Sequence, residues 1–119
     1  MGSVLICDDA VAYGMLFTHW MHDAGVADVM HARTAFHAEE LARELNPSVI
    51  VVDHLLPDAT SAELVPRLRA VAPEARVLLI SGMPEDRLAA AARAAGADGH
   101  IGKASTTAAM REAVLSLMG

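Results

Sequence analysis

The chain has 119 residues, enough for one domain that buries about two-thirds of its unfolded surface without disulfides or a structural metal, so we expect a single domain over residues 1–119. Fifteen acidic against nine basic residues give a formal net charge of −6, which argues against direct contact with nucleic acid or with an anionic membrane surface. The single cysteine, Cys7, indicates a reducing compartment and hence the cytoplasm, and the longest stretch free of Asp, Glu, Lys and Arg, residues 10–22, is shorter than the roughly 20 apolar residues of a membrane helix.

Five short apolar runs alternate with longer segments of helical period, a pattern typical of βαβ units. Near-continuous hydrophobicity suits strands that are covered on both faces. We therefore predict an α/β fold with one five-stranded parallel sheet and five helices on its two faces. The predicted strands are Val4 to Cys7, Asp28 to Met30, Val49 to Val52, Val77 to Ile80 and Gly99 to Ile101.

The first predicted helix runs from about Val11 to Ala24 and carries its large apolar residues on one stripe, which we expect to face the core. His19 and His22 then face solvent with Asp23. Their spacing could hold zinc only with further ligands that the neighbouring sequence does not supply. The stripe consists of Tyr13, Leu16, Phe17, Trp20, Met21 and Ala24.

The second and third predicted helices differ in how clearly they begin and end. The second stops at Asn46-Pro47, because a residue before proline is disfavoured in helical geometry. The third has a possible capping box in Thr60 and Glu63, but Pro66 removes a hydrogen bond and predicts a later onset or a kink. Their apolar spacing comes from Ala38, Leu41, Ala42 and Leu45 in the second helix and from Leu64, Leu68 and Val71 in the third.

The last two helices have clear end signals. The fourth, Glu85 to Ala95, ends at Gly96, which is expected in the left-handed conformation. The fifth, from about Thr106 to Met118, begins behind Ser105 or Thr106 as its N-cap.

Polar residues follow four of the five predicted strands. Asp8 and Asp9 follow the first, Asp53 the third and Ser81 the fourth, while Lys103 lies two residues past the fifth. Right-handed crossovers bring the carboxyl ends of parallel strands to one edge of the sheet, where ligands bind in such folds. We therefore expect these residues to form one site.

Three carboxylates at this edge would repel one another unless a cation joined them. Magnesium prefers carboxylate and phosphate oxygens, so Asp8, Asp9 and Asp53 predict a magnesium site, with manganese as the alternative ion. Zinc is disfavoured because Cys7 and His54 are the only softer ligands beside these strand ends. An acidic pair after a strand can also be the N-cap of the next helix, so both interpretations of Asp8-Asp9 stay open.

Asp53 at the end of a buried strand could act as a nucleophile toward a phosphoryl group and form an acyl phosphate. The transition state of such a transfer spreads charge over the equatorial oxygens, so positioned positive charge is the main requirement. Lys103 and the metal would supply that charge, Ser81 a hydroxyl donor, and the amides around Gly82 and Ala104 further donors. Taken alone, Lys103 is better explained as a solvated lysine at a strand end, and it is the company of the other polar residues that favours a functional role.

Four segments together resemble the receiver domain of two-component response regulators. Each is weakly specific alone, but their order and spacing cover almost the whole chain. The resemblance implies a phosphoacceptor domain similar to chemotaxis regulators, with a flavodoxin-like (βα)5 fold and strand order 2-1-3-4-5. The segments are VLICDD, VVDHLLPD, LLISG and GADGHIGKA.

The same resemblance implies a role for each residue at the strand ends. Asp53 would be the phosphoacceptor, and the metal ligands would be Asp8, Asp9, Asp53 and the main-chain carbonyl of Leu55. Ser81 and Lys103 would bind the phosphoryl group.

Three positions depart from the pattern of that family. His100 replaces the usual Tyr or Phe whose rotamer switches, and a smaller ring that is charged below about pH 6.5 predicts weaker or pH-sensitive switching. Ala104 replaces the proline that often follows the lysine, and we expect a trans bond because a cis bond there would cost about 3 kcal/mol. Ser61 replaces the usual glycine and alters the entry to the third helix.

The resemblance implies a signalling module that takes a phosphoryl group from a histidine kinase or a phosphotransfer protein. Phosphorylation would then change the surface of the fourth helix, fifth strand and fifth helix, which could also form a homodimer. The output could be a transcription domain outside this chain. Apart from self-catalysed phosphotransfer and autodephosphorylation, we expect no enzymatic activity.

Two other functions would also use parts of this sequence pattern. A metal-dependent small-molecule phosphohydrolase would use Asp53 for turnover, but no general base and no substrate-enclosing insertion are evident in the sequence. A flavodoxin-like module for FMN or cobalamin lacks a Ser/Thr-Gly phosphate cradle after the first strand and an Asp-x-His-x-x-Gly motif.

Overall fold

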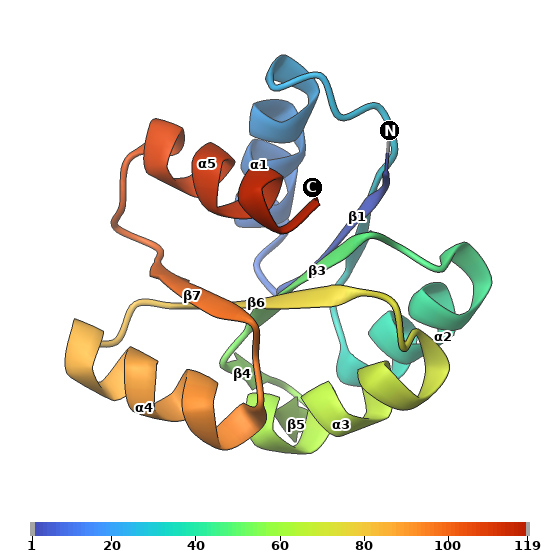
Figure 1. Cartoon of the computed structure of the whole chain (residues 1–119), viewed down its shortest axis with the longest axis vertical. Helices are drawn as coiled ribbons and strands as arrows, with labels where there is room; N and C mark the ends of the chain where they lie inside the picture. Colours follow the sequence, from blue (N-terminus) through green and yellow to red (C-terminus); the bar gives the residue numbers. More distant parts are fainter. Residues whose placement is uncertain (1, 119) are drawn as a thin grey trace.

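A computed structural model describes residues 2–118, and Figure 1 shows a sheet between two layers of helices. Five parallel strands lie in the order β2-β1-β3-β6-β7, with α1 and α5 on one face and α2, α3 and α4 on the other. This arrangement confirms the predicted fold and the order 2-1-3-4-5, because β6 and β7 are the fourth and fifth strands of the sheet. The strands are β1 Val4–Cys7, β2 Val29–Ala32, β3 Val49–Asp53, β4 Leu55–Leu56, β5 Ala59–Thr60, β6 Arg76–Ser81 and β7 Gly99–Gly102, and the helices are α1 Val11–Asp23, α2 Ala35–Leu45, α3 Ser61–Val71, α4 Glu85–Ala95 and α5 Thr107–Met118.

The side chains of the central strands alternate between two apolar clusters, because successive residues of a strand point to opposite faces. In β1, Leu5 and Cys7 join the cluster under α2, α3 and α4, whereas Val4 and Ile6 join the cluster under α1 and α5. All four are essentially inaccessible to solvent. Burial on both faces explains why these strands read as continuous apolar runs in the sequence.

Apart from single-residue extensions of β3, β6 and β7, two features of the strands differ from the prediction. The second strand is Val29–Ala32, not Asp28 to Met30, because its register places His31 and Ala32 opposite Ile6 and Cys7. A short antiparallel hairpin, β4 with β5, follows β3 and was not expected. Two-residue strands are too short to leave a periodic signal in the sequence.

The predicted apolar stripe of α1 is partly wrong. Phe17 and Met21 are fully buried, but 49% of Leu16 is exposed. Gly14, which the predicted stripe did not include, is buried on the face of the helix that the ring of His31 contacts. Leu45 of α2 is also exposed, by 41%, although its spacing predicted burial.

The predicted late onset of α3 is wrong. The helix begins at Ser61 behind a complete capping box, in which the Glu63 amide donates to the Thr60 hydroxyl and the Thr60 amide donates to the Glu63 carboxylate. Pro66 is the sixth residue of this helix and removes only the hydrogen bond to the carbonyl of Ala62. The exposed position of Pro66 leaves its ring outside the core.

Other helix ends follow the sequence signals. Gly96 ends α4 with φ 76°, and Asn46 ends α2 with φ 47°, so both adopt the left-handed conformation. The Thr106 hydroxyl accepts a hydrogen bond from the amide of Ala109 at the start of α5. Across residues 2–118, none of the helices combines the length and the apolar character that crossing a bilayer requires.

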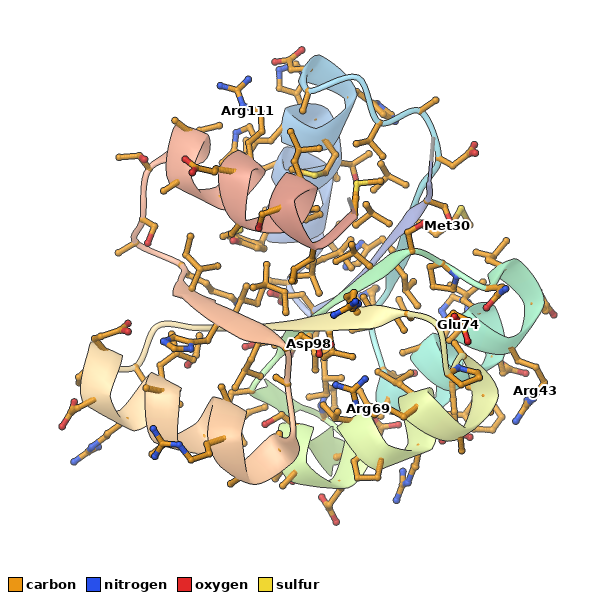
Figure 2. The ribbon with its side chains drawn as sticks, viewed as in Figure 1. Met30, Arg43, Arg69, Glu74, Asp98 and Arg111 are labelled. Atoms are coloured by element: carbon orange, nitrogen blue, oxygen red, sulfur yellow. The ribbon has the colours of Figure 1, made fainter. Side chains whose placement is uncertain are left out.

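A polar contact ties α3 to the loop before β7. Asp98 accepts hydrogen bonds from the amide of Val77 at 2.8 Å and from Arg69 at 3.1 Å. Figure 2 shows Arg69 and Asp98 side by side, and Asp98 directly precedes β7, at the amino end of that strand. These bonds hold β7 in register with β6.

Candidate functional site

The carboxyl ends of β1, β3, β6 and β7 bring the predicted site residues together. One carboxylate oxygen from each of Asp8, Asp9 and Asp53 lies within 4.8 Å of the others. Asp53 is the last residue of β3, and its neighbours β1 and β6 lie on either side. The expected convergence of the three acids is therefore present in the structure.

Asp8 is the most buried member of this acidic cluster, with no solvent exposure. Its Oδ1 accepts a hydrogen bond of 2.9 Å from the amide of Ala10. Its Oδ2 lies 2.6 Å from Nζ of Lys103 and has no aligned hydrogen-bond donor. The alternative role as a helix cap is not supported, because the N-cap of α1 is Ala10 and no side chain caps that end.

Lys103 lies between two of the acids. Its Nζ is 3.4 Å from Oδ2 of Asp53, in addition to the shorter contact with Asp8. Partial burial lowers the pKa of Lys103, but the close contact with Asp8 and the charges of Asp53 and Asp8 outweigh it, so the pKa is raised. With its side chain only 26% exposed, Lys103 is part of the site and not a free surface lysine.

The side chain of Asp53 is 15% exposed at the end of β3. Burial raises the pKa of Asp53, the charge of Lys103 lowers it, and the charges of Asp8 and Asp9 raise it, so the net shift is upward. The site therefore holds more negative charge than one ammonium balances. A divalent cation would relieve this repulsion.

The donor set suits a hard cation. Three carboxylates supply oxygen ligands, and the Oδ2 atom of Asp8 is buried without an aligned donor. Soft ligands are poorly placed, because the thiol of Cys7 is fully buried and its pKa is raised by that burial and by Asp8. The acidic cluster could thus hold a metal ion such as Mg²⁺ or Mn²⁺.

The other predicted site residues lie at or just beyond the ends of β6 and β7 and in the β4–β5 hairpin. The Ser81 side chain is buried at the end of β6, and its hydroxyl accepts a hydrogen bond from the amide of Met83. Gly82 and Ala104 are exposed beyond β6 and β7. Leu55 opens the β4–β5 hairpin with 61% of its surface exposed.

The hairpin that carries Leu55 is fixed at its base by His54 and Ser61. Nδ1 of His54 lies 2.8 Å from the Ser61 hydroxyl, and the Ser61 amide donates to the His54 carbonyl at 2.9 Å. Ser61 is 1% exposed, so its side chain fills the entry to α3 where a glycine would leave space. The predicted change at this helix entry therefore takes the form of a side-chain hydrogen bond to His54.

His100 on β7 points toward the start of α4. Its Nε2 lies 2.8 Å from Oε1 of Glu85, and its side chain is 30% exposed. The bond before Ala104 is trans, as expected, since the described residues contain no cis peptide bond.

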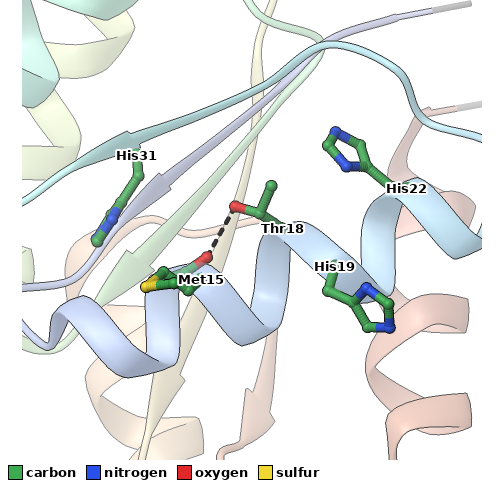
Figure 3. Close-up of a pocket in the computed structure, with 6 residues that line it drawn as sticks. Met15, Thr18, His19, His22 and His31 are labelled. Atoms are coloured by element: carbon green, nitrogen blue, oxygen red, sulfur yellow. Dashed lines mark hydrogen bonds between the residues drawn. The ribbon is translucent and has the colours of Figure 1, made fainter.

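Sequence reasoning missed His31, which supports the acidic loop from behind. Its Nε2 lies 2.7 Å from the main-chain oxygen of Asp8, and because a carbonyl only accepts, Nε2 must donate. A Cβ on Gly14 would lie 2.1 Å from the His31 ring, so only glycine leaves room for it. Figure 3 shows His31 reaching from β2 toward α1, beside a pocket of about 370 Å³ that is also lined by Met15, Thr18, His19 and His22.

Two further residues were also missed, and neither leaves a local signal. Asp58 in the hairpin turn accepts hydrogen bonds from the amides of Ala35 and Phe36 at the start of α2, and the Ala35 bond contributes most to its lowered pKa. Tyr13 on α1 places its ring under Lys103, with Nζ 4.7 Å from the ring centroid. Both contacts join segments that are distant in the sequence.

Comparison with known proteins agrees with this geometry. The model of the response regulator receiver domain family matches residues 4–115. The chemotaxis protein CheY of Thermotoga maritima is 27% identical over 100 residues, which cover 84% of this chain and 83% of that protein. A LuxR-family two-component response regulator from an Aurantimonas species superposes with a TM-score of 0.89 at 26% identity, covering 99% of this chain and 85% of that one. The chemotaxis response regulator CheY4 of Vibrio cholerae gives a TM-score of 0.88 at 23% identity over 98% of both chains.

Proposed function

This chain belongs to the response regulator receiver domain family, and on that premise we propose that it accepts a phosphoryl group on Asp53 in a magnesium-dependent phosphorelay. The donor is a histidine kinase or a phosphotransfer protein. The observation that carries the proposal is the approach of Asp8, Asp9 and Asp53 within 4.8 Å, with Lys103 3.4 Å from Asp53.

The proposed reaction transfers the phosphoryl group from a donor histidine to a carboxylate. An oxygen of Asp53 forms a bond to phosphorus while the phosphorus–nitrogen bond breaks and its electron pair leaves with the imidazole. Lys103 and the Ser81 hydroxyl bind phosphoryl oxygens, and the amides of Gly82 and Ala104 supply further donors. These groups stabilise charge that develops in the transition state.

The proposed metal ligands are Asp8, Asp9, Asp53 and the main-chain carbonyl of Leu55, for Mg²⁺ or Mn²⁺. When bound, the metal neutralises negative charge on the phosphoryl oxygens and on the cluster. The hydrogen bond from His31 holds the segment that carries Asp8, and the hydrogen bond between His54 and Ser61 holds the hairpin that carries Leu55.

Phosphorylation is proposed to change the surface of α4, β7 and α5. Ser81 moves toward the phosphoryl group and His100 leaves Glu85 to fill the space behind it. This surface engages the output, either as a homodimer or through a partner, and a transcription domain outside this chain is one such output. We also propose a cytoplasmic location, no direct contact of this domain with nucleic acid or membrane, and no turnover of external substrates beyond phosphotransfer and its own dephosphorylation.

The test is incorporation of phosphate from acetyl phosphate with magnesium, followed by intact mass. Wild-type protein should gain one phosphoryl group and Asp53→Asn none, whereas Asp86→Asn, an exposed acid on α4, should react like wild type. Chelation of the metal should stop the reaction. Equal modification of the Asp53→Asn variant would refute the assignment, and release of phosphate from p-nitrophenyl phosphate over many turnovers would refute the non-enzymatic role.

A further inference from the structure

Tyr13 is the single tyrosine of the chain, and its ring lies against the site. Nζ of Lys103 sits 4.7 Å from the ring centroid, within the range of a cation–π contact. The phenol hydroxyl is buried and has no hydrogen-bond partner among residues 2–118. Burial and the charges of Asp8 and Asp53 raise the pKa of Tyr13 to about 12, so the ring stays neutral near pH 7.

We propose that Tyr13 is a positioning residue for Lys103, whose ammonium it holds at the phosphoryl site through the face of its ring. The inference rests on the proposed function of Lys103 in binding the phosphoryl group. It assigns the role to the ring and not to the hydroxyl.

The need for such a partner follows from the two ion pairs of Lys103. One pair is with Asp8 and the other with Asp53, and the proposed metal site requires both of these carboxylates. A lysine side chain has four flexible carbons, so an ammonium that shares its anions with another cation is poorly fixed. The neutral ring of Tyr13 competes with neither cation and keeps the ammonium beside Asp53.

The ring of Tyr13 is itself held in place by Trp20. The two rings meet edge to face, with centroids 6.0 Å apart and an interplanar angle of 87°, a favourable geometry for aromatic pairs. Tyr13 and Trp20 both pack against the apolar cluster under α1 and α5. A rigid ring can restrict the ammonium more effectively than a flexible aliphatic side chain.

The kinetic test compares two substitutions that separate ring from hydroxyl. Tyr13→Phe keeps the ring, so its rate constant for phosphorylation by acetyl phosphate with magnesium should stay within about twofold of wild type. Tyr13→Leu keeps an apolar side chain without a π-face, so its rate constant should fall about three- to tenfold. In a Lys103→Met background the same Leu substitution should cause no further fall, because the cation on which Tyr13 acts is gone.

A spectroscopic test needs no phosphodonor. Protons above an aromatic face shift upfield, so the ε-methylene protons of Lys103 should be upfield in wild type and in Tyr13→Phe and should return to ordinary values in Tyr13→Leu. Thermal melting of each variant identifies any loss of fold that would make its rate meaningless.

Three outcomes would overturn the inference. One is a Tyr13→Leu variant with an unchanged rate constant and unchanged Lys103 shifts. Another is an equal fall for Phe and Leu, which would make the hydroxyl the working group. The third is a Tyr13→Leu substitution that lowers the phosphorylation rate constant as much in the Lys103→Met background as in the wild-type background. If wild-type protein takes up no phosphate at all, the proposed function fails, and the Lys103 shifts still decide whether the ring holds the ammonium.

Discussion

Nζ of Lys103 lies closer to Oδ2 of Asp8, at 2.6 Å, than to the carboxylate on which the proposed chemistry takes place. Asp8 has no solvent exposure, and this oxygen has no aligned hydrogen-bond donor. A buried carboxylate without a counter-charge is strongly unfavourable. Lys103 therefore stabilises the fold as well as supplying positive charge to the site.

Replacing Lys103 with methionine should expose this dual role. Lys103→Met leaves Asp8 without its cation and should lower the free energy of unfolding by about 1–3 kcal/mol, less than for a fully enclosed pair because the lysine is partly exposed. Magnesium should restore more stability to the variant than to wild type, since a cation beside Asp8 replaces the lost charge. Urea denaturation with and without magnesium measures both effects.

Arg87→Met is the matched control for this experiment, because it removes one positive charge from an exposed position on α4. It should change stability by less than about 0.5 kcal/mol and leave the magnesium effect unaltered. If Lys103→Met matched this control in both its stability and its response to magnesium, the ion pair with Asp8 would not contribute to the stability of the fold.

Gly14 and His31 provide a second prediction. A Cβ at position 14 would lie 2.1 Å from the His31 ring, so Gly14→Ala must displace the ring that donates to the Asp8 carbonyl. The variant should lose about 1–3 kcal/mol of stability and bind magnesium more weakly, although alanine favours helix. Thermal melting and a magnesium titration measure these losses.

The double variant Gly14→Ala/His31→Ala separates this clash from a general effect of alanine in α1. With the ring removed, the added methyl group has space, so Gly14→Ala should be neutral or stabilising in that background. Strictly additive effects would show that the two residues act independently.

The fold and the main site were predictable because both depend on patterns that are local in the sequence. Apolar runs such as VLIC and VIVV mark strands covered on both faces, and parallel strands place the residues that follow them at one edge. Asp8, Asp9, Asp53, Ser81 and Lys103 could therefore be grouped before any geometry was available.

The supporting contacts could not be predicted, because each depends on how distant segments pack. The close packing of Gly14 follows from the His31 ring on β2, which a helical wheel of α1 does not contain. In the same way, Asp58 binds α2 across the hairpin turn, and Tyr13 meets Lys103 through the packing of α1 beside the site. Helical period identified Tyr13 as a core residue, and only the tertiary structure gives it an ionic neighbour.

The contact between His100 and Glu85 yields a third prediction, which rests on the proposed switch. Glu85→Gln removes the charge that holds His100 toward α4, so the switched state should form more readily and beryllofluoride with magnesium should bind about twofold more tightly. The stability of the unmodified protein should change by less than about 0.5 kcal/mol, because Glu85 is largely exposed.

Asp86→Asn is the control for Glu85→Gln, since it removes an acid from the same turn of α4 without touching His100. It should leave the beryllofluoride affinity unchanged. Equal tightening in both variants would point to the net charge of α4 and away from the contact with His100.

The fourth prediction concerns acid and the far end of the sheet, where Asp98 bridges α3, β6 and β7. Burial raises the pKa of Asp98, but hydrogen bonds from Val77 and Arg69 outweigh it and place the pKa below its ordinary value. A pKa of Asp98 that is lower in the folded than in the unfolded protein stabilises the fold fully above the unfolded value of about 3.9, and this stabilisation is lost as the pH falls through the folded pKa.

Asp98→Asn should therefore lower the unfolding free energy by about 1 kcal/mol at pH 7 and by progressively less below about pH 4. Urea denaturation across this range measures the difference, with the exposed Asp28→Asn as control. A gap between wild type and Asp98→Asn that stayed constant down to pH 3 would show that the charge of Asp98 is not what holds β7 to β6.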